Sequence, residues 1–342
     1  MFELTDAEAA VGGRPVALPQ AVAAAATLLA GAAVPVIAGL RTDAAGAVAA
    51  VALARRLGAV LDHADSTAAL RDLDAMRSVG WIVATPLLVR AEADLVCIVG
   101  DVAPESIAML ALDRPPALDA AQRPRRVERL AAGGDLTERL GTVRVLAKGR
   151  PIAAPPDLVA LAEALRSARY GVAVWSAMAM PPLAVEMLCG LIDDLNAATR
   201  FAGMPLPAPG NAAGVAQALG WETGFPFRVA FRDGIPHHDV HRYDAGRLVE
   251  GGEADVVLWL DALDGGPPPW QRRVKLVALA PPGARFPAAP DVAIAVGRPG
   301  VDHAAALFHP AAATLLAATP TAPSARPTAA DLLGRIAAAL PC

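Results

Sequence analysis

Apolar runs rich in β-branched residues alternate along this chain with longer segments of helical composition. The runs cover residues 34–40, 81–87, 93–101, 170–177, 254–262, 274–282 and 291–299. Because these runs are continuously apolar, they predict strands buried on both faces, which occur in parallel sheets covered by helices. The pattern therefore predicts the α/β fold class with Rossmann-like topology.

The apolar stretch from Ala21 to Leu40 has the length of a membrane span, but it is mostly Ala and Gly and contains Pro35. We expect a helix over residues 18–32 that leads into the strand at 34–40. The first residues, MFELTDAEAAVGG, include acidic side chains where a signal peptide carries basic ones. These features predict a soluble, cytoplasmic protein that makes no membrane contact.

Composition argues against one class of partner. The chain has 342 residues, is 55% hydrophobic and 19% charged, and carries a formal net charge of −4. Its Lys and Arg residues form no block, whereas binding to a phosphate backbone needs clustered cations. Nucleic acid is therefore not an expected partner. The proline-rich segments at 113–126 and 265–270 are interpreted as surface loops or a flap.

Common chemical motifs are missing from the sequence. No Gly-x-Gly-x-x-Gly follows a predicted strand, and neither a P-loop nor a Gly-x-Ser-x-Gly elbow occurs. A conventional NAD site, ATP hydrolysis and serine hydrolysis therefore have no support. Cys97, Cys189 and Cys342 are far apart in sequence, and the first two lie in apolar runs typical of small buried cysteines.

Three histidines stand close together in the stretch GIPHHDVHRYD. His237 and His241 have the i, i+4 spacing of two ligands on one helix face, but Gly234 and Pro236 precede them and favour a loop. A polar surface or interface loop containing His237, His238 and His241 is the preferred interpretation over a metal or catalytic site. The remaining histidines, His63, His303 and His309, are isolated and are interpreted as ordinary structural residues.

Carboxylates follow the predicted strands at Asp62, Asp101 and Asp261. The carboxyl edge of an open α/β sheet is where ligands bind, so each residue is a candidate binding group. A carboxylate at this position also caps the next helix, and capping alone is a sufficient explanation. Capping is the preferred interpretation for all three.

Residues 210–263 carry motifs that resemble the B subunit of formylmethanofuran dehydrogenase, a family of molybdopterin or tungstopterin oxidoreductases related to formate dehydrogenase. The matching positions are Asn211 and Gly214 of an Asn-x-x-Gly element, Trp221, Thr223, Gly224, Phe225 and Pro226 of a Trp-x-Thr-Gly-Tyr/Phe-Pro element, and Gly252, Glu253 and Asp255 of a Gly-Glu-x-Asp element. The resemblance extends from about Val16 to Pro310 and is weakest in the proline-rich middle.

The resemblance implies two Rossmann-like domains like the central domains of formate dehydrogenase-type pterin enzymes, without the iron–sulfur domain. One domain would comprise residues 1–66 and 196–342, and residues 67–195 would form an inserted α/β domain. In the family, the histidine stretch corresponds to a loop that holds no metal.

Catalytic members of the family carry a Cys or selenocysteine metal ligand after the second strand, followed by His-Gly-Pro. This chain has DHADSTAALRD there, with Ala68 near the ligand position, and an alanine cannot ligate a metal. The first cysteine is Cys97, so the cysteine cluster of catalytic members is missing as well. The resemblance therefore implies no metal, no cofactor and no catalytic residue, with Asp101, Asn211 and Gly214 as candidates for the remains of the pterin cleft.

Within this family, the chain resembles the reduced B subunit of the bacterial formyltransferase/hydrolase complex, which acts in tetrahydromethanopterin-linked oxidation of formaldehyde to formate. The resemblance implies a structural subunit whose partners are the A, C and D subunits of that complex, of which A is of the amidohydrolase type and D is a formyltransferase. The chemistry would take place in those other subunits.

Two alternatives remain open. The chain could be part of an active pterin-dependent oxidoreductase with a non-cysteine ligand, for which Asp65 and Ser66 are the nearby candidates. It could also be a free-standing α/β protein that binds a nucleotide or small acid near Asp101, Ser106 and Asn211. The high apolar content favours large obligate interfaces over a free-standing monomer.

Overall fold

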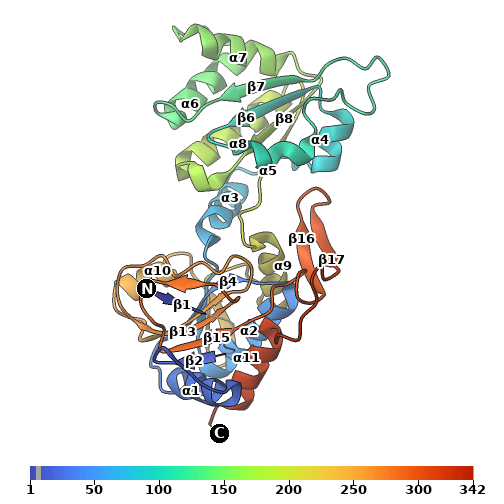
Figure 1. Ribbon diagram of the computed structural model, residues 1–342. Helices are drawn as coiled ribbons and strands as arrows, with labels where there is room; N and C mark the ends of the chain where they lie inside the picture. Colours follow the sequence, from blue (N-terminus) through green and yellow to red (C-terminus); the bar gives the residue numbers. More distant parts are fainter. Residues whose placement is uncertain (5–8, 342) are drawn as a thin grey trace. The chain divides into compact units, whose positions relative to one another are not determined.

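The computed structural model describes residues 1–4 and 9–341, and the chain divides into two compact units (Figure 1). The first unit comprises Met1–Ser66, Pro209–Phe308 and Leu315–Cys342, and the second comprises Thr67–Ala208 with His309–Thr314. The expected return to the first domain near residue 196 differs from this division. Strand β9 (Arg200–Pro205) pairs with β8 (Tyr170–Trp175), so the second unit continues to Ala208.

The first unit is built on a nine-stranded mixed sheet. Its strands follow the order β11 (Ile235–His238), β10 (Val229–Arg232), β5 (Val60–Leu61), β4 (Pro35–Arg41), β12 (Val256–Asp261), β13 (Lys275–Ala280), β15 (Val292–Ala295), β2 (Ala9–Val11) and β3 (Arg14–Pro15). The strands from β5 to β15 are parallel, and the two strands at each end are antiparallel. The central strands are buried along almost their whole length, as their apolar runs predict.

Helices cover both faces of this sheet. On one face lie α1 (Leu18–Ala30), α2 (Ala44–Leu57), α9 (Ala212–Thr223) and α11 (Ala329–Ala338). On the other face, α10 (Ala245–Glu250) and the small β1–β14 pair (Phe2–Glu3 with Arg285–Phe286) pack on Val36, Val257 and Trp259. A further two-stranded sheet joins β16 (Ala305–His309) and β17 (Thr314–Ala318).

Local sequence explains why α2 begins and ends where it does. The carboxylate of Asp43 accepts a hydrogen bond from the Gly46 N–H at 3.0 Å, as an N-cap residue does. At the other end, Gly58 adopts the left-handed conformation with φ of 66°, which ends the helix. The helix therefore starts immediately after the carboxyl end of β4, where the candidate site lies.

The second unit contains a four-stranded, fully parallel sheet. The strand order is β7 (Arg126–Leu130), β6 (Leu95–Val99), β8 and β9. One face packs against α3 (Ser66–Ser78), α6 (Leu136–Ala147), α7 (Pro156–Arg166) and α8 (Pro182–Asn196), and the other against α4 (Pro86–Glu92), α5 (Pro104–Ile107) and the short 3-10 turn η1 (Ala108–Leu110).

A buried tryptophan links α3 to the sheet of the second unit. The indole N–H of Trp175 donates to the carboxylate of Asp72 at 2.8 Å. Burial raises the pKa of Asp72 to about 7, although the bond from Trp175 opposes this rise. Asp72 therefore holds a charge near neutral pH only at a cost in free energy.

The strand predicted at residues 81–87 is wrong. Thr85 caps α4, which begins at Pro86, and only Val83 forms an isolated bridge, to Gly203. Ile82 and Val83 are 57% and 54% exposed, so this apolar run lies at the surface. A proline after an N-cap residue starts a helix, and this signal outweighs the β-branched composition.

Inside the second unit, the proline-rich segment at 113–126 is an irregular connection ending at β7. Arg125 fixes it, because its buried guanidinium donates to the carbonyl oxygens of Val89, Ala93 and Ala111 at 2.9–3.0 Å. The carbonyl groups of Val89 and Ala93 lie at the end of α4, where a cation is favourable.

Cys97 and Cys189 are buried, as the sequence predicts, whereas Cys342 lies outside the described residues. Among residues 1–4 and 9–341, no helix is both long and apolar enough to cross a membrane.

Candidate functional site

Polar side chains gather at the carboxyl edge of the sheet in the first unit, where β4, β5 and β12 end. Arg41, the last residue of β4, contacts Asp65 at 2.9 Å, Asp264 at 3.4 Å and the buried Asp261 at 3.5 Å. Asp261 also accepts hydrogen bonds from the backbone N–H groups of Asp264 and Gly266. The guanidinium is therefore already surrounded by carboxylates and is not available to an acidic ligand.

His63 lies beside this cluster and is 2% exposed. The Asp65 N–H donates to Nδ1 at 3.0 Å, so the proton is on Nε2, which donates to the Gly210 carbonyl at 3.1 Å. Burial lowers the pKa of His63 to about 4. The ring is neutral at physiological pH, and both nitrogens are used inside the protein.

Asp62 and Arg228 form a second buried group near the end of β5. Arg228 contacts Asp244 at 2.6 Å, the Ser66 hydroxyl at 3.3 Å and Asp62 at 3.5 Å. Asp62 also accepts from the backbone N–H of Ala245, the first residue of α10. Burial raises the pKa of Asp62 to about 6, against the opposing effect of Arg228. Asp62 thus caps a helix, but a distant one rather than the next along the chain.

The Asn-x-x-Gly element joins three segments of the first unit. The side chain of Asn211 donates to the Thr42 carbonyl at 2.7 Å and accepts from the Phe308 N–H at 2.8 Å. A Cβ at Gly214 would lie 2.5 Å from the Asn211 amide, so only glycine leaves room for it. Both the nitrogen and the oxygen of the Asn211 amide are hydrogen-bonded within the first unit. The fold therefore explains Asn211 and Gly214 without a ligand.

The other strand-end candidates belong to the second unit. Asp101 is exposed and lines an open hollow of about 500 Å³ beside Gly100 and Arg129. Ser106 is also exposed, on the short helix α5. Neither side chain takes part in a described hydrogen bond that would orient it toward a ligand.

The positions proposed as metal ligands are occupied in other ways. Asp65 pairs with Arg41, and Ser66 accepts from Arg228. Ala68 is 7% exposed and packs in the core of the second unit. In the part of the chain that the structure describes, no group of three His, Cys, Asp or Glu side chains is arranged to hold a metal ion.

The histidine stretch is a strand and a turn rather than a loop, so that prediction is corrected. His237 and His238 lie in β11, which pairs with β10 through a two-residue turn in which Asp233 and Gly234 have φ of 52° and 75°. Neighbouring residues of a strand point to opposite faces, so these two rings cannot share a ligand. The Asp-Gly dipeptide is a strong hairpin signal that predicts this turn.

His238 is half-buried, whereas His237 and His241 are exposed. Its Nδ1–H donates to the Phe227 carbonyl at 2.8 Å, and its ring stacks on Phe225 at 5.2 Å. The three histidines therefore have different surroundings and form no common site.

Sequence reasoning missed Arg41 and Arg228, which organise the carboxyl edge, and gave His63 only an ordinary structural role. A signal existed for the first, because a charged residue ending a buried strand must find a partner. The geometry shows a strand edge in which most charges and amides satisfy one another, whereas the buried Oδ1 of Asp62 has no hydrogen-bond partner among the described residues. The chain is thus an α/β protein of two units, and the polar groups at this sheet edge mainly stabilise its fold.

Comparisons with known proteins identify the family. No protein-family model matches the chain. The chain is 35% identical over 339 residues to the B subunit of the formyltransferase/hydrolase complex Fhc of Methylorubrum extorquens, over 92% of this chain and 93% of that protein. A shorter match, 41% identical over 68 residues, joins 20% of this chain to 16% of the B subunit of the tungsten-containing formylmethanofuran dehydrogenase 2 of Methanocaldococcus jannaschii.

A solved structure agrees with these matches. One chain in the crystal structure of the Methylorubrum extorquens formyltransferase/hydrolase complex (FhcABCD) with methylofuran superimposes with a TM-score of 0.86 and 34% identity, covering 96% of this chain and 98% of that one. The chain belongs to the family of B subunits of the formyltransferase/hydrolase complex. The resemblance indicated by the Asn-x-x-Gly and Gly-Glu-x-Asp elements is thereby confirmed.

Proposed function

We propose that this chain is a non-catalytic structural subunit of a formyltransferase/hydrolase complex in tetrahydromethanopterin-linked oxidation of formaldehyde to formate. The observation that carries the proposal is the 35% identity to the B subunit of an Fhc complex over 92% of the chain. Its partners are the A, C and D subunits, of which A is of the amidohydrolase type and D is a formyltransferase. Formyl transfer and hydrolysis take place in those partners.

The residues at the family's metal position support a structural role. Ala68 offers no ligand atom, and the carboxylate of Asp65 and the hydroxyl of Ser66 already bind arginines. An oxidoreductase that used either residue as a ligand would have to break these contacts. The free-standing binder is not supported either. Arg41 and Arg228, the arginines of the carboxyl edge, are already paired with carboxylates, so a small acidic ligand would find no available cation there.

The finer fold and the domain plan belong to the same proposal. We assign the two compact units to the two Rossmann-like domains of the formate dehydrogenase type, with the second inserted into the first. The parallel order of β5, β4, β12, β13 and β15 under helices on both faces supports this assignment. Of the residues expected at the remains of a pterin cleft, Asp101 belongs to the second unit, and Asn211 and Gly214 belong to the first.

Exposed apolar side chains support a role in assembly. Large apolar residues that are more than half exposed include Ile82, Val83, Leu87, Leu183 and Trp221. A contiguous exposed apolar patch is typical of a surface that binds another chain, and Ile82, Val83 and Leu87 come from one short stretch of the sequence.

The test is to produce the chain alone and together with its three partner subunits. We expect the chain alone to self-associate, and the joint preparation to give one hetero-oligomer whose melting temperature is higher by about 4 °C or more. Size-exclusion chromatography and thermal melting measure both properties. A monodisperse monomer that binds none of the other subunits and melts at the same temperature in both preparations overturns the proposal.

A further inference from the structure

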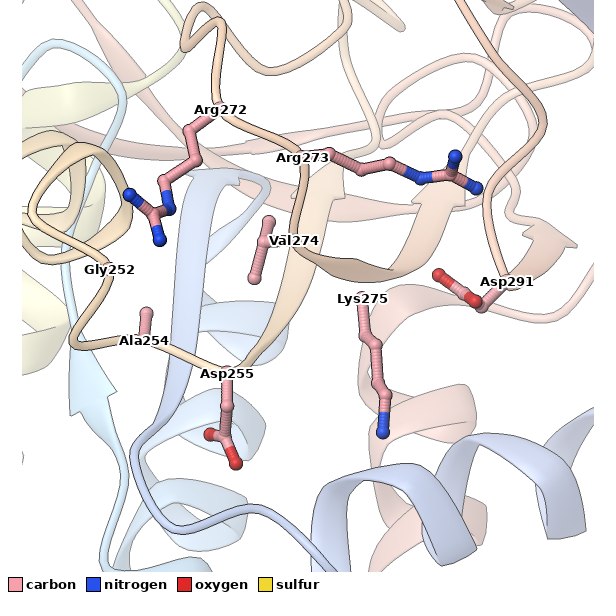
Figure 2. A pocket seen from close by; sticks show the side chains of 8 residues that line it. All are labelled: Gly252, Ala254, Asp255, Arg272, Arg273, Val274, Lys275 and Asp291. Carbon is pink, nitrogen blue, oxygen red and sulfur yellow. The ribbon is translucent and has the colours of Figure 1, made fainter.

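A groove runs along the edge of the first unit opposite the candidate site, at the amino ends of β12, β13 and β15 (Figure 2). It consists of two adjoining hollows of about 430 Å³ and about 230 Å³. Both hollows are lined by Arg272, Arg273, Val274 and Asp291, so they form one continuous surface, called here the 272–275 groove.

Backbone contacts hold the segment that carries the cations of this groove. The carboxylate of Glu250 accepts from the Gln271 N–H at 2.7 Å. Gly252 has φ of 72°, and a Cβ there would lie 2.5 Å from the Arg272 guanidinium. The guanidinium therefore rests directly against a glycine backbone, which explains the first residue of the Gly-Glu-x-Asp element.

The acidic residues of the groove are already used. Asp255 accepts from the N–H groups of Ala33 and Val34 at 2.8 and 3.0 Å, and Asp291 accepts from the Leu276 N–H at 2.9 Å. Within the described residues, no carboxylate lies at ion-pair distance from the three cationic side chains of the groove. These are Arg272, Arg273 and Lys275.

The groove therefore has three cationic side chains and two carboxylates that accept from backbone N–H groups, in a chain with a formal net charge of −4. Arginine and lysine side chains gathered without acidic partners attract negative charge on another molecule.

Geometry selects an extended occupant over a small anion. Figure 2 shows the side chains of Arg272, Arg273 and Lys275 pointing in different directions, which suits contacts spread along an occupant better than contacts with one phosphate-sized anion. The smaller hollow adds apolar surface from Trp270 and Pro287. An occupant that matches both halves is a chain segment with several acidic residues and an apolar side chain.

We propose that the 272–275 groove docks an extended acidic segment of another subunit, with an apolar side chain of that segment against Trp270. The inference rests on the proposed function, since it requires a complex. In this proposal the partner subunit binds at the edge formed by the amino ends of the strands. The opposite edge, which contains Arg41, only stabilises the fold.

A charge-reversal experiment tests the groove. The variant Arg272→Glu/Arg273→Glu/Lys275→Glu is produced together with the partner subunits. Its matched control, Arg14→Glu/Arg150→Glu/Arg232→Glu, makes the same charge change at exposed arginines outside the groove. We expect the groove variant to bind the partners about tenfold or more weakly, and the control to bind as the unchanged chain does. Binding of the unchanged chain is expected to weaken with rising salt.

The possible outcomes distinguish the docking proposal for the groove from the proposed role in the complex. If both variants assemble equally well, the docking proposal for the 272–275 groove is overturned and the proposed structural role stands. If the unchanged chain fails to assemble, the docking proposal and the structural role are both overturned. Hydrogen exchange of the unchanged chain guards against a variant that misfolds. Slower exchange at residues 270–276 on assembly supports the groove, and unaltered exchange there overturns it. Equal protection of the free chain by millimolar inorganic phosphate shows a small-anion site and also overturns it.

Discussion

His238 shows how one side chain among three similar ones acquires a structural role. Its ring donates to the Phe227 carbonyl and stacks on Phe225, while His237 and His241 face solvent. We expect His238→Ala to lower the free energy of unfolding by about 1–2 kcal/mol, and His237→Ala and His241→Ala to change it by less than about 0.5 kcal/mol.

Denaturant unfolding of the single variants measures these differences, and turnover of the assembled complex completes the test. All three variants are expected to retain turnover, because none of the rings shares a site with another. A loss beyond about tenfold in a variant that still assembles, equivalent to about 1.4 kcal/mol, would restore a catalytic role for that histidine.

Asp72 gives the protein a defined pH dependence. Its pKa is about 7 in the folded protein and 3.8 in the reference state, because burial disfavours the charge. The stability that this carboxyl provides is full below pH 3.8 and is lost as the pH rises to about 7. Asp72→Asn, which keeps an acceptor for Trp175, should therefore add about 1–2 kcal/mol at pH 8 and almost nothing at pH 4.

Urea unfolding at the two pH values checks this difference. Asp74→Asn on the same helix is the control, since the Asp74 side chain is 67% exposed and should show no comparable gain. A variant Asp72→Asn that is less stable than the unchanged protein at pH 8 would contradict the explanation by burial.

At the scale of elements, the sequence predicted most of the strands that are buried on both faces, but it missed β9 (Arg200–Pro205). The runs that became β4, β6, β8, β12, β13 and β15 are apolar over most of their length, although β4 contains Pro35 and Gly39 and β8 contains Gly171. The run at 81–87 failed because Thr85 and Pro86 start a helix. The antiparallel strands β10 and β11 were missed because exposed histidines and Pro236 hid a hairpin that the Asp233–Gly234 turn predicts.

The candidate site was less predictable, for a physical reason. The carboxylates Asp62 and Asp261 were placed correctly at strand ends, but their partners come from segments far along the chain. Arg41 and Asp261 are separated by 220 positions and Asp62 and Ala245 by 183, so no local pattern indicates that they meet. Only the fold brings these groups together. Because they bind one another there, they are not free to bind a ligand.

Helix α9 contains two glycines that should respond in opposite ways to alanine. Gly214 faces the Asn211 amide, where a Cβ would come within 2.5 Å, whereas a Cβ at Gly220 meets nothing within 4 Å. We expect Gly220→Ala to stabilise the protein by about 0.5–1 kcal/mol, as alanine does inside a helix. Gly214→Ala should destabilise it by about 1–3 kcal/mol, because overpacking would displace Asn211.

Thermal melting of both variants distinguishes the two positions. Equal stabilisation by Gly214→Ala and Gly220→Ala would show that the Asn-x-x-Gly element is not held by this contact.

At the scale of the whole molecule, the expected metal content follows from the cysteines. Burial raises the pKa of the Cys97 and Cys189 thiols to about 12, so neither supplies the thiolate that a metal needs. We therefore expect elemental analysis of the purified chain, alone and in its complex, to find no stoichiometric molybdenum, tungsten or iron. About one such atom per copy of this chain would contradict the structural assignment and favour an active oxidoreductase.

The discontinuous first unit has a consequence for synthesis on the ribosome. β4 and β5 emerge early, but β12, the partner of β4 in the centre of the sheet, is made only after the main segment of the second unit, Thr67–Ala208, has been translated. The second unit is nearly contiguous and has its own core, so it can fold while β4 still waits for its neighbour. A nascent chain stalled shortly before residue 256 would therefore contain a largely folded second unit and a strand β4 that can pair with β5 but still lacks its central partner β12. That intermediate is the form of this protein most in need of a chaperone.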